Sequence, residues 1–210
     1  EDDDIIVINK PFDMPAHPSA GNHDNTLANA LMYYYGSQNK PFVYRCINRL
    51  DRDTTGLTIV AKHALAGGIL GNAVAKRAIH RTYYAVCSGC TPACMRISAP
   101  IARKDASTIE RCVDFKRGEN AVTDFIRIKY NPDNNLSLVK LRLLTGRTHQ
   151  IRVHMKYIGF PLIGDFLYNP DYTYISRQAL HSGRLVFTHP VTGQKMNLIS
   201  DIPSDMKSLF

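Results

Sequence analysis

Hydrophobic and polar positions along the chain predict a mixture of strands and helices. Runs rich in β-branched and aromatic residues predict strands at residues 5–8, 42–47, 57–61, 80–86, 121–130, 136–144, 184–187 and 195–199. Apolar residues at helical spacing predict helices over residues 27–35, 63–78 and 147–158, the first of them capped by Asn25 or Thr26 and stopped by Gly36. Strands and helices do not alternate strictly, so the pattern indicates an α+β fold with a mixed, largely antiparallel sheet.

The alternating residues of the strands predicted at 121–130 and 136–144 indicate a β-hairpin, with its turn at residues 131–135. In the helix predicted over residues 147–158, Ile151, Met155 and Ile158 form an apolar stripe. Four polar residues of this helix are expected on its other faces, namely His149, Arg152, His154 and Lys156.

Charged and turn-forming residues concentrate at residues 47–56, between two predicted strands. A buried strand could not satisfy so many charges, so we expect a loop that holds Asp51 between two rigid elements, where reactive groups commonly stand. A plain tight turn explains much of the same segment, because Asp53 and the threonines after it bond readily to backbone and Gly56 tolerates positive φ. The pattern alone leaves both interpretations open.

Composition favours a polyanionic partner. The 210 residues carry a formal charge of +8, and because Glu1 to Asp4 contribute four negative charges, residues 5–210 carry +12. Basic residues gather locally at Arg96, Arg103, Lys104, Arg111, Lys116 and Arg117. With 44% hydrophobic residues, a chain of this length can bury one substantial core. Charge alone does not identify nucleic acid as the partner, since many basic proteins bind none.

The cysteines and the apolar segments indicate a cytoplasmic protein without metal. No apolar run approaches the roughly 20 residues that span a bilayer, and no charged-then-apolar leader opens the chain. Five scattered cysteines argue for a reducing compartment. Cys87, Cys90 and Cys94 lack the second pair of ligands usual in zinc sites, so we expect free thiols, with Cys87 on a strand and the other two in the turn that follows.

Four motifs in order resemble those of the RluA-type pseudouridine synthases. Residues 48–57 resemble that family's Arg-Leu-Asp signature, and residues 145–154 are similar to its most specific block, which continues through residues 158–168. Lys10-Pro11 resembles the opening motif and residues 81–85 the tyrosine motif. The motifs cover nearly the whole chain. Two positions depart from the family pattern, and they are Asn48, where histidine is expected, and Arg81, where lysine is expected.

The resemblance implies a fold and a reaction. The fold would be a long bent mixed sheet flanked by helices, with a catalytic cleft across its middle. The reaction would isomerise uridine in structured RNA, ribosomal or transfer RNA, to pseudouridine. It would need no cofactor, because nothing is oxidised and no group is imported. We expect one catalytic domain over residues 1–210, without a separate N-terminal RNA-binding domain or an obligate protein partner.

The resemblance also implies the site. Asp51 would be the nucleophile, attacking either the sugar or the uracil ring, and Arg152 the cation that keeps it ionised. Tyr83 would lie against the base, although the sequence does not choose between it and Tyr84. Arg49 would fill the gap that a flipped-out uridine leaves.

Two further residues, Arg147 and His149, are expected to contact phosphate.

Two rival functions would use the aspartates and the basic residues of this chain. Asp51 and Asp53, with Asp165 downstream, resemble loosely the aspartates of a magnesium-dependent phosphatase, and the basic residues would equally suit a non-catalytic RNA-binding module. Magnesium dependence tests the first rival, and substitution of Asp51 tests the second.

Overall fold

The computed structural model describes residues 1–19, 21, 23–106 and 109–210. The chain divides into two compact units. Unit 1 contains Glu1–His80 and Ser182–Ser200, and unit 2 contains Arg81–His181 and Asp201–Phe210. The expectation of one catalytic domain over residues 1–210 stays a prediction.

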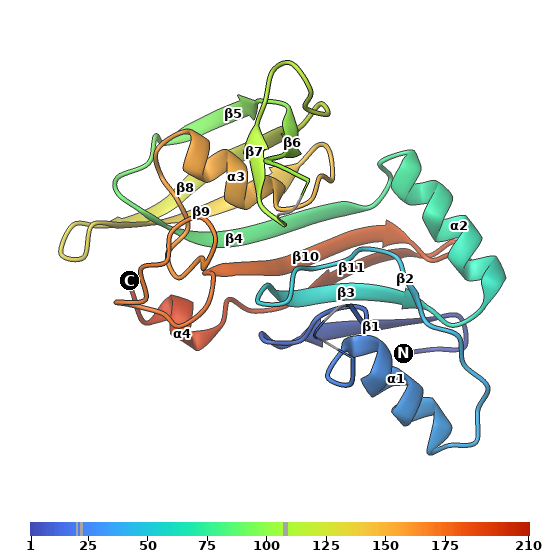
Figure 1. The fold of residues 1–210 in the computed structure, drawn as a ribbon. Coiled ribbons are helices and arrows are strands. Elements are labelled where there is room, and N and C mark those ends of the chain that lie inside the picture. The colour runs from blue at the N-terminus through green and yellow to red at the C-terminus, as the bar shows by residue number, and fades with distance from the viewer. Residues whose placement is uncertain (20, 22, 107–108) are drawn as a thin grey trace. The chain divides into compact units, whose positions relative to one another are not determined.

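Unit 1 is built on a sheet that helices cover (Figure 1). Its elements are β1 (Ile5–Lys10), α1 (Leu27–Gly36), β2 (Arg45–Cys46), β3 (Thr55–Ala61), α2 (Ala64–Ala75), β10 (Leu180–Thr188, within this unit from Ser182 onward) and β11 (Lys195–Ile199). Strand β1 pairs antiparallel with β3, from Ile5 opposite Ala61 to Lys10 opposite Gly56. Strand β2 also pairs with β3. Strand β10 lies on the side of β3 away from β1 and pairs in turn with β11.

Strand β3 is the centre of this unit because both of its faces are covered. Side chains of a strand point alternately to opposite faces. Ile59 packs in one cluster with Leu70 of α2, and the next residue, Val60, packs in another cluster with Leu31 of α1. Every residue of β3 is therefore buried, which explains why its sequence is continuously apolar or small.

Helix α1 begins at a capping box. The Thr26 hydroxyl accepts a hydrogen bond from the backbone N–H of Asn29, and the Asn29 side chain accepts one from the backbone of Thr26. Near the end of α1, three consecutive tyrosines differ in exposure because successive residues of a helix point in different directions. Tyr35 is 1% exposed in the core, whereas Tyr33 is 80% exposed. The predicted helix is confirmed.

Unit 2 is an antiparallel sheet with two helices and a short two-stranded ribbon. The sheet contains β4 (His80–Ser88), β9 (Leu136–Leu143), β8 (Val122–Asn131) and β5 (Cys94–Ser98), in that order. Strands β6 (Ile101–Arg103) and β7 (Arg111–Val113) pair separately, and the helices are α3 (Gln150–Tyr157) and α4 (Ser204–Lys207). The predicted hairpin of β8 and β9 is confirmed, with a bulge between Arg127 and Lys129.

The α+β class with mostly antiparallel strands is confirmed, but several predicted boundaries were wrong. The strand expected over residues 42–47 is reduced to β2, and the helix expected from Arg147 begins only at Gln150. Four elements that the pattern did not predict are present, namely β5, β6, β7 and α4. Strands as short as β6 and β7 give too few positions for an alternating pattern to stand out. No helix within the described part of the chain is long and apolar enough to cross a membrane.

Candidate functional site

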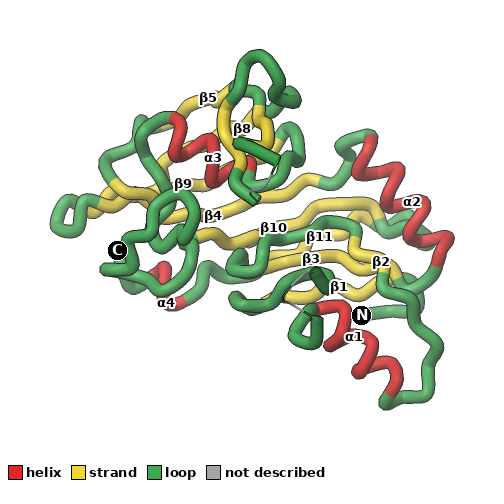
Figure 2. Tube along the Cα trace, in the orientation of Figure 1, coloured by secondary structure: helices red, strands yellow, loops and turns green. Residues whose placement is uncertain are grey.

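The Asp51 segment is a loop and turn between β2 and β3 in unit 1 (Figure 2). Asn48 fastens its start to β3, because its side-chain oxygen accepts the Ile59 N–H at 2.8 Å and its amide group donates to the Leu57 carbonyl at 3.2 Å. Asn48 and Leu50 are buried, whereas Arg49 is exposed and Asp51 is partly exposed. The asparagine at position 48, which departs from the family pattern, therefore holds the loop in place.

Lys10 fastens the other side of the same loop. Its ammonium group is buried, with the residue 1% exposed, and it donates to the carbonyls of Pro11, Met14 and Arg52 at 2.8, 2.9 and 2.8 Å. The Met14 N–H also bonds the Arg52 carbonyl at 3.2 Å. The backbone next to Asp51 is thus tied to the end of β1. Sequence reasoning treated Lys10 only as a family motif and missed this role, because a lysine before a proline does not indicate burial.

The turn after Asp51 uses the residues that tight-turn chemistry requires. The Thr54 N–H bonds the Asp51 carbonyl at 3.2 Å, and Arg52 forms a bidentate ion pair with Asp53 at 3.1 Å for both bonds. Gly56 has φ +106°, and a Cβ there would lie 2.3 Å from the Ser182 carbonyl oxygen. Only glycine satisfies both the backbone angle and the close approach of the neighbouring strand.

Arg152 lies in unit 2, buried on α3 and held in a fixed orientation. Its Nε and Nη2 donate to the two carboxylate oxygens of Asp165 at 2.7 and 2.8 Å, and both side chains are essentially inaccessible, at 2% and 0% exposed. The guanidinium also lies over the rings of Phe166 and Tyr168, 5.4 and 5.0 Å from their centroids. The bidentate pair uses Nε and Nη2 and so leaves Nη1 out of the contact with Asp165.

Asp165 is accordingly a structural carboxylate. Its Oδ1 also accepts the backbone N–H groups of Leu167 and Tyr168 at 3.1 and 3.2 Å. Both oxygens are occupied by donors and the side chain is buried, so Asp165 is unsuited to the magnesium-binding role that a phosphatase would require.

Tyr168 links α3 to the β6–β7 ribbon. Its hydroxyl oxygen accepts the Arg111 N–H at 2.8 Å and is hydrogen-bonded to Nδ1 of His149 at 2.9 Å. Burial raises the pKa of Tyr168 to about 12, and the backbone bond from Arg111 and the charge of Arg152 only partly oppose this rise. Tyr168 therefore stays neutral at physiological pH. His149 stands before α3 in the left-handed conformation, with φ 56°.

A buried polar network holds α3 against β8. Gln150 donates to the Thr123 hydroxyl at 3.0 Å, which lies 2.9 Å from Nδ1 of His154, and Nε2 of His154 bonds the Ala99 carbonyl at 2.9 Å. The other end of the Gln150 side chain accepts from the Thr145 hydroxyl at 2.8 Å. The sequence predicted His154 and Arg152 on faces other than the apolar stripe, but it did not predict that both would be fully buried. Both are buried because each finds partners distant in the sequence.

The two candidate tyrosines occupy opposite faces of β4. Tyr83 is 5% exposed and pairs across the sheet with Leu141. Tyr84 packs against the hydrophobic cluster that contains Val86 and Leu136. Both tyrosines therefore have packing partners, and the choice of Tyr83 over Tyr84 stays a prediction.

The predicted site residues are distributed over both units. Arg49 and Asp51 belong to unit 1, whereas Tyr83, Arg147, His149 and Arg152 belong to unit 2. Within unit 2, Arg147 forms an ion pair with Glu119, and its Nε donates to the Asn120 carbonyl at 3.1 Å.

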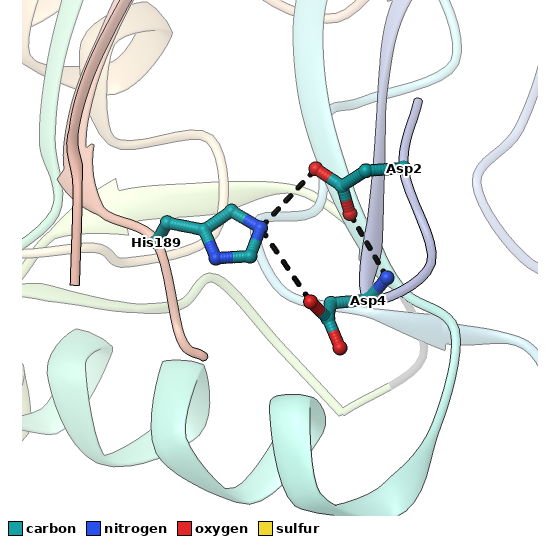
Figure 3. A group of neighbouring side chains, drawn as sticks. All are labelled: Asp2, Asp4 and His189. Carbon is teal, nitrogen blue, oxygen red and sulfur yellow. Dashed lines mark hydrogen bonds and ion pairs between the residues drawn. The ribbon is translucent and has the colours of Figure 1, made fainter. Parts of the chain in front are cut away.

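Asp2, Asp4 and His189 form the one group of three potential metal ligands among the residues that the structure describes (Figure 3). Nδ1 of His189 accepts the N–H groups of Val191 and Thr192 at 3.3 and 3.1 Å, so the ring hydrogen lies on Nε2, which donates to Asp2 at 3.2 Å. A nitrogen that carries hydrogen does not bind a metal. Burial acts to raise the pKa of Asp2, but backbone hydrogen bonds and the His189 ring lower it below its usual value.

The cysteines follow the expected positions in part. Cys87 is buried on β4, as predicted, and burial raises the pKa of its thiol. Cys90 lies in the loop after β4, but Cys94 is the first residue of β5 and not part of that turn.

Comparison with known proteins gives one consistent result. Residues 4–157 match the family of RNA pseudouridylate synthases. The chain is 39% identical over 210 residues to the uncharacterized RNA pseudouridine synthase YhcT of Bacillus subtilis, covering all of this chain and 69% of that protein. It is 38% identical over 227 residues to ribosomal large subunit pseudouridine synthase D of Zymomonas mobilis, covering all of this chain and 70% of that one.

Among solved structures, human RNA pseudouridylate synthase domain containing 1 superposes with a TM-score of 0.79 at 25% identity. The match covers 96% of this chain and 81% of the human one.

Proposed function

The chain belongs to the RluA-type family of RNA pseudouridine synthases, and on this premise we propose that it modifies uridine in ribosomal RNA with Asp51 as its nucleophile. The observation that carries the assignment is the position of Asp51. It is a partly exposed carboxylate on a loop that Asn48 and Lys10 fix to the sheet of unit 1. The choice of ribosomal RNA rests on relatives named as ribosomal large subunit pseudouridine synthases. A cytoplasmic location stays a prediction.

The reaction is an isomerisation, and its steps require few groups. The bond between the ribose and N1 of uracil breaks, the base turns, and the sugar rejoins at C5, from which one proton leaves for N1 or solvent. In the proposal Asp51 makes the transient covalent bond, either to the ribose or to the ring, and is released unchanged. Nothing is oxidised or reduced, so the chain's own side chains suffice.

Three other side chains have roles in the proposal. Arg152 supplies positive charge that favours the ionised form of Asp51, and its rigid pairing with Asp165 keeps the guanidinium preorganised for that purpose. Tyr83 lies against the base and stacks on it or relays the C5 proton. Arg49, exposed and two residues before Asp51, occupies the space that the flipped-out uridine vacates.

Substitution of Asp51 tests the proposal. Asp51→Asn keeps the shape of the side chain but removes the nucleophilic oxygen, so we expect no detectable pseudouridine in unmodified ribosomal RNA. The variant should fold, and it should bind RNA at least as tightly as the parent because a negative charge is lost. Pseudouridine mapping of the treated RNA, with circular dichroism and RNA binding measured in parallel, provides the readout.

Asp53→Asn is the matched control, because it makes the same chemical change two residues away. Asp53 pairs with the exposed Arg52 in the turn. Loss of this ion pair should lower stability slightly and leave the activity unchanged. Activity that survives in Asp51→Asn but is lost in Asp53→Asn would overturn the assignment. The magnesium-dependent phosphatase interpretation is wrong, as the family shows, and activity should accordingly persist in EDTA with a prefolded RNA.

A further inference from the structure

Unit 2 contains a basic pocket whose arginines, apart from Arg147, have no role assigned above. Its volume is 510 Å³. It lies beside the ribbon of β6 and β7 and is lined by Ile101, Ala102, Arg103, Arg111, Arg117, Glu119, Gly146, Arg147 and Thr148. Four of these nine residues are arginines, and Glu119 is the only acid among them.

Two of the arginines face each other directly across the ribbon. In the register of β6 and β7, Arg103 is the partner of Arg111. Like charges opposite one another on antiparallel strands are destabilising, by up to about 1 kcal/mol. A ribbon whose strands have three residues each offers little other pairing to offset this cost. An anion between the two guanidinium groups would turn the repulsion into attraction.

The neighbouring basic residues are already paired. Arg96 forms a bidentate ion pair with Asp124, at 2.6 and 2.7 Å. Lys104 pairs with Glu110 at 2.9 Å. Arg117 pairs with Asp114 at 2.7 Å. The local concentration of basic residues visible in the sequence therefore separates into neutralised members and a remainder.

Arg103, Arg111 and Lys116 are that remainder, and of these three only Arg103 and Arg111 line the pocket. Within the described ranges, neither forms an ion pair, and the one side-chain hydrogen bond of Arg103 is a long contact of 3.4 Å to the Ala106 carbonyl. Nη1 of Arg111 is fully buried and has no hydrogen-bond partner there. An unsatisfied buried donor on a charged group is costly, and an acceptor that reached Nη1 would remove that cost.

We propose that this pocket binds the phosphodiester backbone of the substrate RNA, with Arg103 and Arg111 as the principal contacts. Guanidinium groups bind phosphate through paired hydrogen bonds. A pocket of 510 Å³ is within the range of about 300–1,000 Å³ that holds small ligands, so it has room for a sugar–phosphate segment rather than a lone phosphate. The inference rests on the proposed function for the identity of the polyanion.

Glu119 moderates the pocket. Its carboxylate pairs with Arg147, so it occupies one cation when RNA is absent. An entering phosphate competes with Glu119 for that guanidinium. Loss of the Glu119 charge should therefore strengthen RNA binding, an effect opposite in sign to loss of the arginines.

The test compares two double variants that remove the same net charge. Arg103→Gln with Arg111→Gln removes the proposed contacts. Arg96→Gln with Arg184→Gln removes two exposed arginines that already bond Asp124 and Asn197. Binding to unmodified large-subunit ribosomal RNA transcript is measured over a range of salt concentrations. The pocket variant should bind at least about tenfold more weakly at low salt, and its salt dependence should lose about one unit of slope per lost contact.

Glu119→Gln provides the second arm, since its outcome does not depend on how well the double variants fold. It should bind the same RNA more tightly than the parent. Equal affinity of the two double variants, or no gain in Glu119→Gln, would contradict the pocket assignment.

Pseudouridine formation by the parent protein on the same transcript separates the two proposals. If the parent forms pseudouridine and the pocket variant binds like its control, the pocket assignment fails and the function stands. If the parent forms none but the pocket variant still binds weakly, the pocket stands and the choice of ribosomal RNA as the modified substrate fails.

Discussion

Lys10 shows how one buried cation can fix a loop that carries a reactive group. Its ammonium group satisfies three backbone carbonyls, one of them on Arg52, the residue after Asp51. Removing the cation leaves those carbonyls without a donor inside the protein. The position of the proposed nucleophile thus depends on Lys10.

We expect Lys10→Met to lower both stability and activity. Loss of the buried contacts should cost roughly 2–4 kcal/mol, which in a chain of this size lowers Tm by roughly 4–16 °C. The rate of pseudouridine formation should fall even at temperatures where the variant is fully folded, because the backbone beside Asp51 loses an anchor. Thermal unfolding and single-turnover kinetics measure the two effects. Lys40→Met, at an exposed lysine, is the control, and an unchanged rate in folded Lys10→Met would rule out the positioning role.

Helix α3 illustrates how an element in which half of the residues are polar can still be buried on most sides. Its contacts with the sheet run through a chain of hydrogen bonds from Gln150 through Thr123 to His154. The Nε2 hydrogen of His154 is donated to the Ala99 carbonyl, so Nδ1 accepts from Thr123 and the ring is neutral. Burial lowers the pKa of His154 below its usual value, and the bond to Ala99 only partly opposes this effect.

The lowered pKa predicts a loss of stability on acidification. Above the unfolded-state pKa of about 6.5, His154 is neutral in both states and the fold has its full stability. As the pH falls from there toward the folded-state pKa, the unfolded chain binds a proton that the folded chain does not, so the free energy of unfolding decreases. His154→Gln should remove part of this decrease. Urea unfolding at pH 8 and pH 5.5 measures it, and an equal decrease in parent and variant would exclude His154 as the cause.

The whole molecule carries a positive charge that should dominate its affinity for RNA. Residues 5–210 carry a formal charge of +12. Part of this charge lies in unit 2, in the pocket that we propose as a phosphate site. Each phosphate neutralised by lysine or arginine releases condensed counterions. Electrostatic attraction of this kind supplies affinity for any RNA, while the choice of uridine depends on contacts with bases.

We expect RNA affinity to fall at least about tenfold between roughly 50 and 200 mM salt. Equilibrium binding to ribosomal RNA transcript at fixed magnesium measures the slope, and circular dichroism at each salt concentration confirms that the protein remains folded. A nearly constant affinity over this range would mean that the basic surface is not the binding surface.

Local patterns in the sequence determined the elements whose contacts lie nearby. The buried run of β3, the hairpin of β8 and β9 and the Thr26-capped α1 followed from residue spacing, because strand and helix periodicity act over a few residues. The motif around Asp51 and the block from Thr145 identified the family, since their residues are fixed by chemistry as well as by packing. Gly56 was predicted to tolerate positive φ, and its φ is +106°, although it lies within β3 and not in the turn before it.

Tertiary structure alone decided which polar residues are buried and what they pair with. Arg152 reads in the sequence as one polar residue of an amphipathic helix, and only the fold brings Asp165 to it and makes the pair inaccessible. His154 is buried because Ala99, far away in the chain, supplies an acceptor. Arg103 and Arg111 become a site only when the ribbon sets them opposite each other. A charged side chain can be buried only where it finds a partner, and here the partners are distant in the sequence. Residue spacing does not encode which distant residues the fold brings together.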